Sequence, residues 1–406
     1  MTDKRVVVIG GGAAGLMACG TAKERAGEVL LIEKNGIPAK KLRITGKGRC
    51  NLTNSAETED FIKNIPTNGK FLYSALYNFT NYDMMELVEG LGVPLKTERG
   101  GRVFPESDNA NDIANALIRF ASGRNVKIIK DTAEGIVCEN GSVIGVKTKS
   151  KFYPADRVVL ATGGMSYPMT GSKGDGYKMA KMLGHTVTPL KPSLVPLVTE
   201  EGWTAELMGL TLKNVGIGIF DEKGRKIFTD FGEMIFTHFG ISGPIVLSAS
   251  AHIKNIGRVF VKIDLKPALT AEMLDKRILR DFEKFSKKHL INSLDELLPK
   301  ALIPVIIKLA GIDAHKEVSS VTKAERHLLS EVIKALPLTV TGTRPIEEAI
   351  VTSGGIKVSE INPSTMESKL VKGLFFAGEI IDVDAYTGGF NLQIAFSTGV
   401  LAGQNV

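Results

Sequence analysis

The 406-residue chain has few of the residues that build disulfide frameworks or metal sites. Its three cysteines, Cys19, Cys50 and Cys138, form no C-x-x-C pair. Their odd number also argues against a disulfide scaffold, a zinc knuckle and a dithiol redox pair. The six histidines show no H-E-x-x-H or similar spacing of metal ligands. We therefore expect no metal site, and a reducing, cytoplasmic environment.

Long hydrophobic runs are also missing. The apolar run 6–20 is rich in glycine, and the run 301–310 is interrupted by Pro304 and Lys308, so neither predicts a membrane span. The first predicted strand begins by residue 6, which leaves no room for a signal peptide. We expect a cytoplasmic protein without a membrane partner.

Glycine is abundant, with 43 residues, and the first cluster has a clear physical meaning. A short apolar strand runs into a G-x-G-x-x-G motif at Gly10, Gly12 and Gly15 and then into a helical pattern that begins with Ala13 and Ala14. Gly10 permits a tight turn, Gly12 leaves room for a pyrophosphate, and Gly15 lets the helix pack closely. The helix N-terminus supplies free N–H groups and a partial positive charge, so the motif predicts a dinucleotide site.

The next predicted strand, 28–33, ends in an acidic residue. Glu33 lies 18 residues after Gly15, where a carboxylate can accept hydrogen bonds from both ribose hydroxyls, and Lys34 follows it. A 2′-phosphate would be repelled there, which disfavours NADP as the bound cofactor.

Two later strands also end in small or acidic residues. The strand 157–160 leads into Ala161, Thr162, Gly163 and Gly164, and the strand near 374–377 leads into Gly378 and Glu379. We expect these strand ends to lie beside the same cofactor, because small residues let the chain pass close to a ligand.

A glycine pair then opens the last predicted helix. Gly388 and Gly389 would present bare N–H groups to the pyrimidine end of a flavin ring, where negative charge accumulates on reduction. An ordinary capped helix is the alternative. The positions of Asp382, Tyr386, Phe390 and Asn391 suggest that they lie near the cofactor: Asp382 could bind the ribityl chain and Tyr386 could stack near the ring.

The net charge is +7, with basic clusters within 40–49, 223–226 and 284–288. Such clusters are either a solvated face or a site for a polyanion, whether the pyrophosphate of FAD or an RNA.

The pattern of predicted elements divides the chain. Strands and helices alternate up to about residue 190, as in an α/β fold with a doubly wound, Rossmann-like sheet. A β-rich stretch and a charged helical stretch follow before strands return. We predict a discontinuous FAD-binding domain at 1–190 and 355–406, a β-rich inserted domain at 191–268 and 336–354, and a helical subdomain at 269–335.

Together these features resemble the FAD-binding elements of the glutathione-reductase-type two-dinucleotide-binding-domain flavoproteins. More narrowly, the chain resembles the aminoacetone-oxidase-like flavoproteins, the bacterial YhiN/YtfP group. The matching stretches are 41–54, 174–177, 236–244, 351–355 and 378–391. The resemblance implies a FAD domain with an inserted β-barrel-like domain and a small helical domain.

The resemblance also implies a FAD-dependent oxidoreductase, with two alternative activities. One is reduction of a uridine of large-subunit ribosomal RNA to dihydrouridine, and the other is oxidation of a small amine such as aminoacetone with oxygen. A non-catalytic flavin-binding assembly factor is a third alternative. Because only one G-x-G-x-x-G is present, either NAD(P)H would act as a transient electron donor or the substrate would reduce the flavin directly. The net charge of +7 favours RNA, whose phosphates need Lys and Arg. The sequence does not determine the oligomeric state.

Several residues are candidates for the chemistry. Cys50 is either a general acid that completes reduction of a pyrimidine double bond or a small buried residue under the flavin. His238 is either an acid or base or a structural histidine. The loop before Cys50 has two interpretations: it binds phosphates, either of FAD or of the substrate, or it is a solvated face. The candidate cofactor contacts in and directly after this loop are Lys41, Arg43, Gly46, Lys47, Arg49, Cys50 and Asn51.

Overall fold

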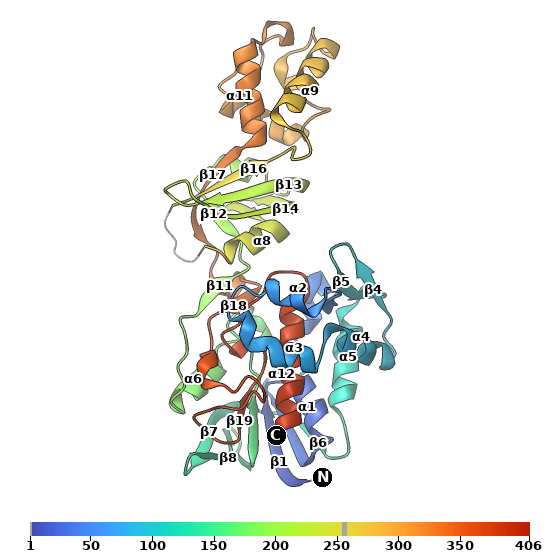
Figure 1. The fold of residues 1–406 in the computed structure, drawn as a ribbon, viewed down its shortest axis with the longest axis vertical. Helices are drawn as coiled ribbons and strands as arrows, with labels where there is room; N and C mark the ends of the chain where they lie inside the picture. Colours follow the sequence, from blue (N-terminus) through green and yellow to red (C-terminus); the bar gives the residue numbers. More distant parts are fainter. Residues whose placement is uncertain (1, 254–257) are drawn as a thin grey trace. The chain divides into compact units, whose positions relative to one another are not determined.

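The computed structural model describes residues 2–253 and 258–406, which form two compact units (Figure 1). The first contains the chain up to Ser193 together with Pro345–Val406, and the second contains Leu194–Arg344. The boundaries differ from those predicted at 190/191 and 354/355. The reason is that β11 (Lys191–Ser193) pairs with β18 (Val351–Ser353), which ties both flanks of the insertion to the first unit.

A five-stranded parallel sheet in the order β19–β10–β1–β2–β6 forms the centre of the first unit and confirms the predicted Rossmann-like fold. Its middle strands are continuous apolar runs, as expected for a parallel sheet covered on both faces. The strands are β1 (Thr2–Ile9), β2 (Ala26–Glu33), β6 (Val126–Lys130), β10 (Arg157–Leu160) and β19 (Leu374–Phe376).

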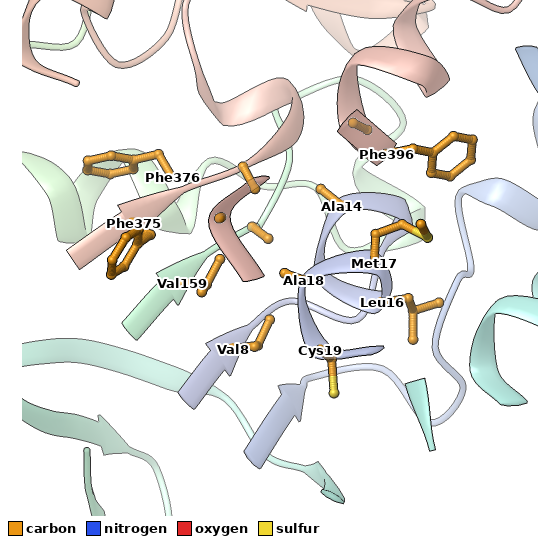
Figure 2. Close-up of a cluster of buried hydrophobic side chains, with 14 of the residues drawn as sticks. Val8, Ala14, Leu16, Met17, Ala18, Cys19, Val159, Phe375, Phe376 and Phe396 are labelled. Carbon is orange, nitrogen blue, oxygen red and sulfur yellow. The ribbon is translucent and has the colours of Figure 1, made fainter. Parts of the chain in front are cut away.

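The first and last helices, α1 (Ala13–Ala22) and α12 (Phe390–Asn405), pack against each other through small residues. A Cβ at Gly399 would lie 2.4 Å from the Ala14 carbonyl oxygen, and one at Gly403 would lie 2.6 Å from the Ala18 carbonyl oxygen. Figure 2 shows Ala14 and Ala18 of α1 in the buried cluster that also contains Phe396 of α12. This close approach brings the C-terminal segment to the glycine motif.

Replacing Gly399 with alanine tests the close approach. Helix propensity alone predicts that alanine stabilises a helix interior by about 1 kcal/mol relative to glycine. The 2.4 Å contact with Ala14 predicts the opposite, a net loss of about 2 kcal/mol in the free energy of unfolding measured with urea. Gly90, at the end of α4 (Asn81–Gly90), is the control, because its Cβ would meet no atom within 4 Å. A gain in stability from both substitutions would contradict this packing.

Smaller elements surround the central sheet. Helix α5 (Ala110–Ala121) packs against α1, where a Cβ at Gly20 would lie 2.3 Å from the Phe120 ring. The others are α2 (Thr58–Lys63), α3 (Tyr73–Asn78), α6 (Asp175–Met182), the sheet of β3 (Thr53–Asn54), β4 (Leu95–Glu98) and β5 (Arg102–Pro105), and the sheet of β7 (Ala133–Glu139), β8 (Ser142–Thr148) and β9 (Phe152–Pro154).

The second unit is built on a closed antiparallel barrel in the order β12–β15–β14–β13–β16–β17, which confirms the β-barrel-like insertion. Helices α8, α9, α10 and α11 contribute buried side chains to its hydrophobic core, and α9 packs on α11. The elements are β12 (Leu197–Thr199), α7 (Trp203–Glu206), β13 (Thr211–Phe220), β14 (Lys226–Thr237), β15 (Gly240–Ser242), α8 (Pro244–Ser250), β16 (Val259–Asp264), α9 (Ala271–Lys284), α10 (Ile303–Leu309), α11 (Lys323–Lys334) and β17 (Leu336–Thr343). Across residues 2–253 and 258–406, no helix has the length and apolar character needed to cross a membrane.

Candidate functional site

The predicted cofactor segments meet at one edge of the parallel sheet. In the register of the sheet, Ile9 pairs with both Leu160 and Ile32, and Leu160 pairs with Phe376. The residues that follow these strand ends are therefore neighbours at the carboxyl edge, which is where open α/β sheets bind ligands. Four segments that are far apart in the sequence form one candidate nucleotide site.

The three glycines of the motif have different surroundings. Gly10 has φ +104°, and a Cβ there would lie 2.5 Å from the Ala161 carbonyl oxygen. A Cβ at Gly15 would lie 1.8 Å from the Gly10 carbonyl oxygen, so both positions require glycine for the fold itself. Among residues 2–253 and 258–406, a Cβ at Gly12 would meet no atom within 4 Å. Since Gly12 precedes the first residue of α1, this open space at a helix N-terminus fits a pyrophosphate.

Glu33 is held in place by backbone donors. Its carboxylate is buried and accepts hydrogen bonds from the N–H groups of Gly11 and Asn35, both at 2.7 Å. The side-chain amide of Asn35 also donates to this carboxylate at 2.8 Å. A carboxylate has about four acceptor positions, so one position is left for a ribose hydroxyl. The adjacent Lys34 forms an ion pair with Asp175 at the start of α6, so its ammonium group is already neutralised by the protein.

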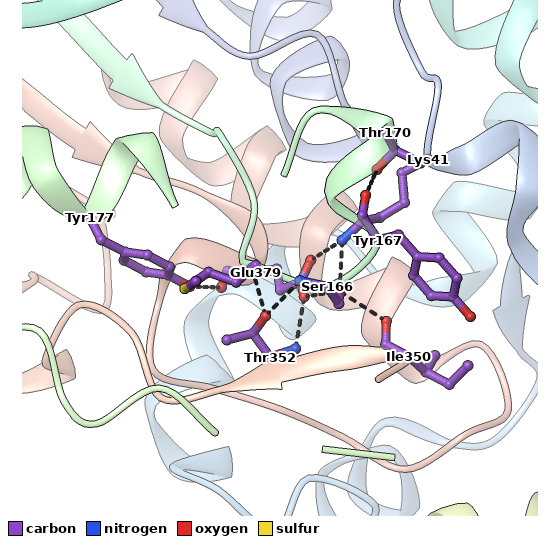
Figure 3. Close-up of polar contacts among 9 residues, drawn as sticks. Lys41, Ser166, Tyr167, Thr170, Tyr177, Ile350, Thr352 and Glu379 are labelled. Atoms are coloured by element: carbon purple, nitrogen blue, oxygen red, sulfur yellow. Dashed lines mark hydrogen bonds and ion pairs between the residues drawn. The ribbon is translucent and has the colours of Figure 1, made fainter. Parts of the chain in front are cut away.

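Glu379 lies at the centre of a polar network that joins four segments (Figure 3). It forms a 3.0 Å ion pair with Lys41 and accepts hydrogen bonds from the Thr352 N–H at 2.9 Å and the Ser166 hydroxyl at 3.1 Å. The Lys41 ammonium also donates to the Ser166 hydroxyl at 2.9 Å. A Cβ at Gly164 would lie 2.8 Å from Glu379 Oε1, so the network packs directly on the strand end after β10.

Removing Lys41 should make the protein more sensitive to acid. Burial alone would raise the pKa of the Glu379 carboxyl, but the Lys41 charge and the hydrogen bonds from Thr352 and Ser166 hold that pKa below its ordinary value. A carboxyl group whose pKa is lower in the folded protein than in the unfolded chain stabilises the fold at pH values above its ordinary pKa. This stabilisation is lost as the pH falls through the pKa of the folded state. In Lys41→Met the pKa of Glu379 rises, so the acid limb of the unfolding curve begins at higher pH.

The size of this pairing is measurable in a double-mutant cycle with Glu379→Gln. We expect a coupling of about 1–2 kcal/mol, because both side chains are less than a third exposed, at 25% for Lys41 and 21% for Glu379. Lys63→Met is the control, since Lys63 pairs with Asp60 in an exposed ion pair with side chains 74% and 61% accessible. An acid limb that shifts equally in both lysine variants would contradict the assignment.

The loop that contains Cys50 has an unusual backbone. Gly46, Lys47, Gly48 and Cys50 all have positive φ, and for Lys47 and Cys50 this conformation is costly. The Cys50 side chain is fully buried, and burial raises the pKa of its thiol to about 12, opposed by a hydrogen bond with Thr45. The thiol therefore stays protonated at neutral pH.

Cys50 is also close to the end of the chain that was predicted to hold the flavin ring. In the amide orientation that satisfies both of its side-chain polar atoms, the next residue, Asn51, accepts a hydrogen bond from the Gly389 N–H at 3.1 Å and donates to the Thr53 carbonyl oxygen at 3.2 Å. In that orientation the loop before β3 supplies an acceptor for the Gly389 N–H, and the binding of a flavin ring by Gly388 and Gly389 stays a prediction. A Cβ at Gly389 would lie 2.3 Å from the Thr53 carbonyl oxygen, so this glycine is needed for packing.

Other predicted residues of the C-terminal segment face the protein. The Asn391 amide accepts from the Ala385 N–H at 2.9 Å and donates to the Ala385 carbonyl oxygen at 2.7 Å, which holds the loop before α12. Phe390 is buried edge-on against Phe61, with ring centroids 4.6 Å apart. Burial and the nearby charge of Asp384 raise the pKa of the Asp382 carboxyl. Its predicted contact with a ribityl chain stays a prediction.

Arg43 and Arg49 bind protein groups in this structure. The Arg43 guanidinium donates to the side-chain carbonyls of Asn111 at 2.6 Å and Asn115 at 2.9 Å, both on α5. Arg49 donates to Asp108 at 2.8 Å and forms an ion pair with Glu98. Both guanidinium groups therefore have partners on neighbouring elements, which weakens their assignment as phosphate contacts.

His238 lies in the second unit, in the turn between β14 and β15. Its side chain is exposed and packs edge-on against Phe239, with ring centroids 4.9 Å apart. The candidate nucleotide site is in the first unit, and a role of His238 as an acid or base stays a prediction.

Sequence reasoning missed three polar residues of the site. The Ser166 hydroxyl and the Thr352 backbone N–H donate to Glu379, and the Thr398 hydroxyl accepts a hydrogen bond from the Gly378 N–H at 2.9 Å. Thr352 lies within the stretch 351–355 that carries the family resemblance, so that stretch could have indicated it. Ser166 and Thr398 have no local signal, since their roles depend on contacts between distant segments.

Comparison with known proteins shows the family to which the chain belongs. The model of the HI0933-like protein Rossmann domain matches residues 4–405. A 3-dehydro-bile acid delta(4,6)-reductase of Clostridium scindens is 32% identical over 98% of this chain and 98% of its own length. A ribosomal RNA dihydrouridine synthase of Escherichia coli is 30% identical over 98% of this chain and 97% of its own length. A 3-ketosteroid delta1-dehydrogenase from Sterolibacterium denitrificans has a similar fold, with a TM-score of 0.52 at 13% identity over 99% of both chains.

Proposed function

The chain belongs to the HI0933-like family and is a FAD-dependent oxidoreductase, and from this we propose that it reduces a uridine of large-subunit ribosomal RNA to dihydrouridine. The observation that carries the proposal is the similarity to a dihydrouridine synthase over 98% of the chain, which includes the inserted unit. The net charge of +7 suits a polyanionic substrate. Because such RNA is made and assembled in the cytoplasm of bacteria, we propose that location.

The reaction adds two hydrogens across the C5–C6 double bond of the uracil ring. One arrives as a hydride and the other as a proton, and NAD(P)H is the electron donor in this proposal. When bound, FAD supplies the hydride transfer. The protein must bind the cofactor, place the base against it, exclude water and supply the proton.

Residues of the first unit suit these tasks. The open space at Gly12 and the N-terminus of α1 would hold the pyrophosphate, and Glu33 would hold the ribose of the adenosine half. The polar network of Glu379 and Lys41 fixes the segments that follow β10 and β19 at the carboxyl edge of the sheet. We assign Cys50 Sγ as the proton donor, because its thiol is protonated and its strained backbone lies beside the start of α12.

A second candidate is reduction of a conjugated double bond in a small apolar substrate. It is favoured by the 32% identity to the bile acid reductase. The chemistry would be the same, since a double bond conjugated with a carbonyl group accepts a hydride and a proton. The two candidates differ only in how the substrate is recognised.

The test is a comparison of substrates with purified, FAD-loaded protein. We would supply NADPH or NADH and ribosomal RNA that lacks dihydrouridine, beside a 3-oxo bile acid with 4,6 double bonds and aminoacetone with oxygen. Dihydrouridine in the RNA, with kcat/KM well above that for either small molecule, is expected. Efficient loss of the bile acid double bonds or peroxide formation from aminoacetone, without dihydrouridine, would overturn the proposal.

A further inference from the structure

The outer surface of the barrel in the second unit carries a set of side chains that the candidate nucleotide site does not use. Along β13, Val215, Ile217 and Ile219 are buried in the barrel core. Since side chains alternate along a strand, the positions between them, Gly216 and Gly218, face outward. Phe220, two residues further on, lies on the same outward face.

The neighbouring strands place aromatic and basic side chains beside these positions. Gly216 pairs with Phe231 of β14, and Phe220 pairs with Phe260 of β16. Gly218 pairs with Lys262 of β16. We call the set of Phe220, Lys226, Phe231, Phe260 and Lys262 the aromatic face.

Two rings of the aromatic face are exposed to solvent. Phe231 is 49% exposed and Phe260 is 37% exposed, although both are large apolar side chains. A Cβ at Gly218 would lie 2.8 Å from the Phe220 ring, so that ring lies over the strand where no side chain stands. Covering the backbone of β13 at Gly218 accounts for the position of the Phe220 ring. It does not account for the exposure of the Phe231 and Phe260 rings.

Positive charge lies beside the rings. The Lys262 ammonium stands 5.3 Å from the centroid of the Phe220 ring, and Lys226 pairs across the strands with Phe220. The acidic residue that pairs across the strands with Gly216 is Asp264 of β16, and its carboxylate forms a 2.5 Å ion pair with Lys334. Two acidic residues near Phe231 are also exposed: Asp230, which pairs across the strands with Ile217, and Glu233, which lies on the same face of β14 as Phe231. The two lysines therefore stand beside the Phe220 end of the aromatic face.

Exposed rings with lysines on a β-sheet surface are the features that bind single-stranded nucleic acid, because bases stack on rings and phosphates bind the ammonium groups. We propose that the aromatic face binds unpaired bases of the RNA substrate. This inference rests on the proposed function and adds a recognition surface to it. A symmetric contact with a second copy of the chain would bring Lys226 and Lys262 against their own counterparts, so charge favours RNA over self-association.

The test measures RNA binding separately from the reaction. A fluorescein-labelled oligouridine of 12 nucleotides is titrated with FAD-loaded protein and followed by fluorescence anisotropy. The double variant Phe231→Leu/Phe260→Leu keeps apolar side chains on the strands but removes both rings. We expect its Kd to rise by about 10- to 100-fold, because stacking on each ring is lost, while its Tm stays close to that of the wild type.

Two further variants make the result specific. Tyr82→Leu removes an equally exposed ring, 47% accessible, whose hydroxyl donates to Glu57 at 3.0 Å, and it should leave the Kd unchanged. Lys262→Gln should weaken binding several-fold and reduce the dependence of log Kd on log salt by about 0.7, the value for one phosphate contact of a single strand.

The outcomes separate this inference from the proposed function. An unchanged Kd in the double variant, with dihydrouridine still formed, overturns the aromatic face and leaves the function standing. RNA binding that depends on both rings, without dihydrouridine from the wild type, supports the face and overturns the function. A wild type that is dimeric by light scattering, binds no oligouridine and becomes monomeric in the double variant would assign the face to a second copy and overturn the inference.

Discussion

Replacing Cys50 with alanine is expected to slow dihydrouridine formation by at least about 100-fold while FAD stays bound, because a positioned general acid contributes about 10²–10⁴ to a rate. Reduction of the bound flavin by NAD(P)H needs no proton from this thiol, so its rate in a stopped-flow experiment should not change. The expected defect therefore lies in the oxidative half of the cycle, where RNA accepts the hydride.

Cys19 provides a matched control for Cys50. It is also fully buried, and burial raises the pKa of its thiol to about 12. However, it lies within α1 and its Sγ donates to the Ala121 carbonyl oxygen at 3.6 Å, away from the strained loop. Cys19→Ala should lower the stability moderately and leave turnover per bound flavin unchanged. If Cys50→Ala also changed stability alone, or released FAD, the thiol would be a packing residue.

Replacing Gly12 with valine is expected to produce a protein that folds but no longer retains FAD. A Cβ at Gly12 would meet no protein atom within 4 Å, and its φ of −82° is accessible to valine, so the apo protein should keep its Tm. The side chain would fill the space next to the N-terminus of α1 that the pyrophosphate needs. We expect the Kd for FAD to rise at least about 100-fold, which corresponds to about 2.7 kcal/mol.

Gly202→Val is the control for Gly12→Val. Gly202 is the N-cap of α7, and a Cβ there would also meet no atom within 4 Å. This variant should keep both its Tm and its flavin absorbance. Gly15→Val, in contrast to Gly12→Val, should not fold, because a Cβ at Gly15 would lie 1.8 Å from the Gly10 carbonyl oxygen. Retention of FAD by Gly12→Val would show that the pyrophosphate does not approach this glycine.

The parts of the fold that depend on local patterns were predictable. The spacing of Gly10, Gly12 and Gly15, the apolar runs of the parallel strands and the return of strands after residue 335 all follow from turn chemistry and side-chain periodicity. The boundaries of the insertion were less accurate, because the pairing of β11 with β18 joins segments about 160 residues apart and has no local signal.

The partners of charged residues were the least predictable part of the candidate site. Lys41, Arg43 and Arg49 lie close together in the sequence, yet Lys41 binds Glu379, Arg43 binds amides of α5, and Arg49 binds acidic side chains. A basic cluster in a sequence shows that charge is present, but long side chains find their partners only after the chain has folded around them.

The sequence by itself determined the class of cofactor and the layout of strands around it, because glycine spacing and strand periodicity are properties of short segments. Only the tertiary structure decided which glycine leaves an open space, which carboxylate pairs with Lys41 from the far end of the chain, and which rings stay exposed on the barrel. The physical reason is that these features depend on strand register and on close packing between distant segments, where a shift of one residue exchanges an inward side chain for an outward one.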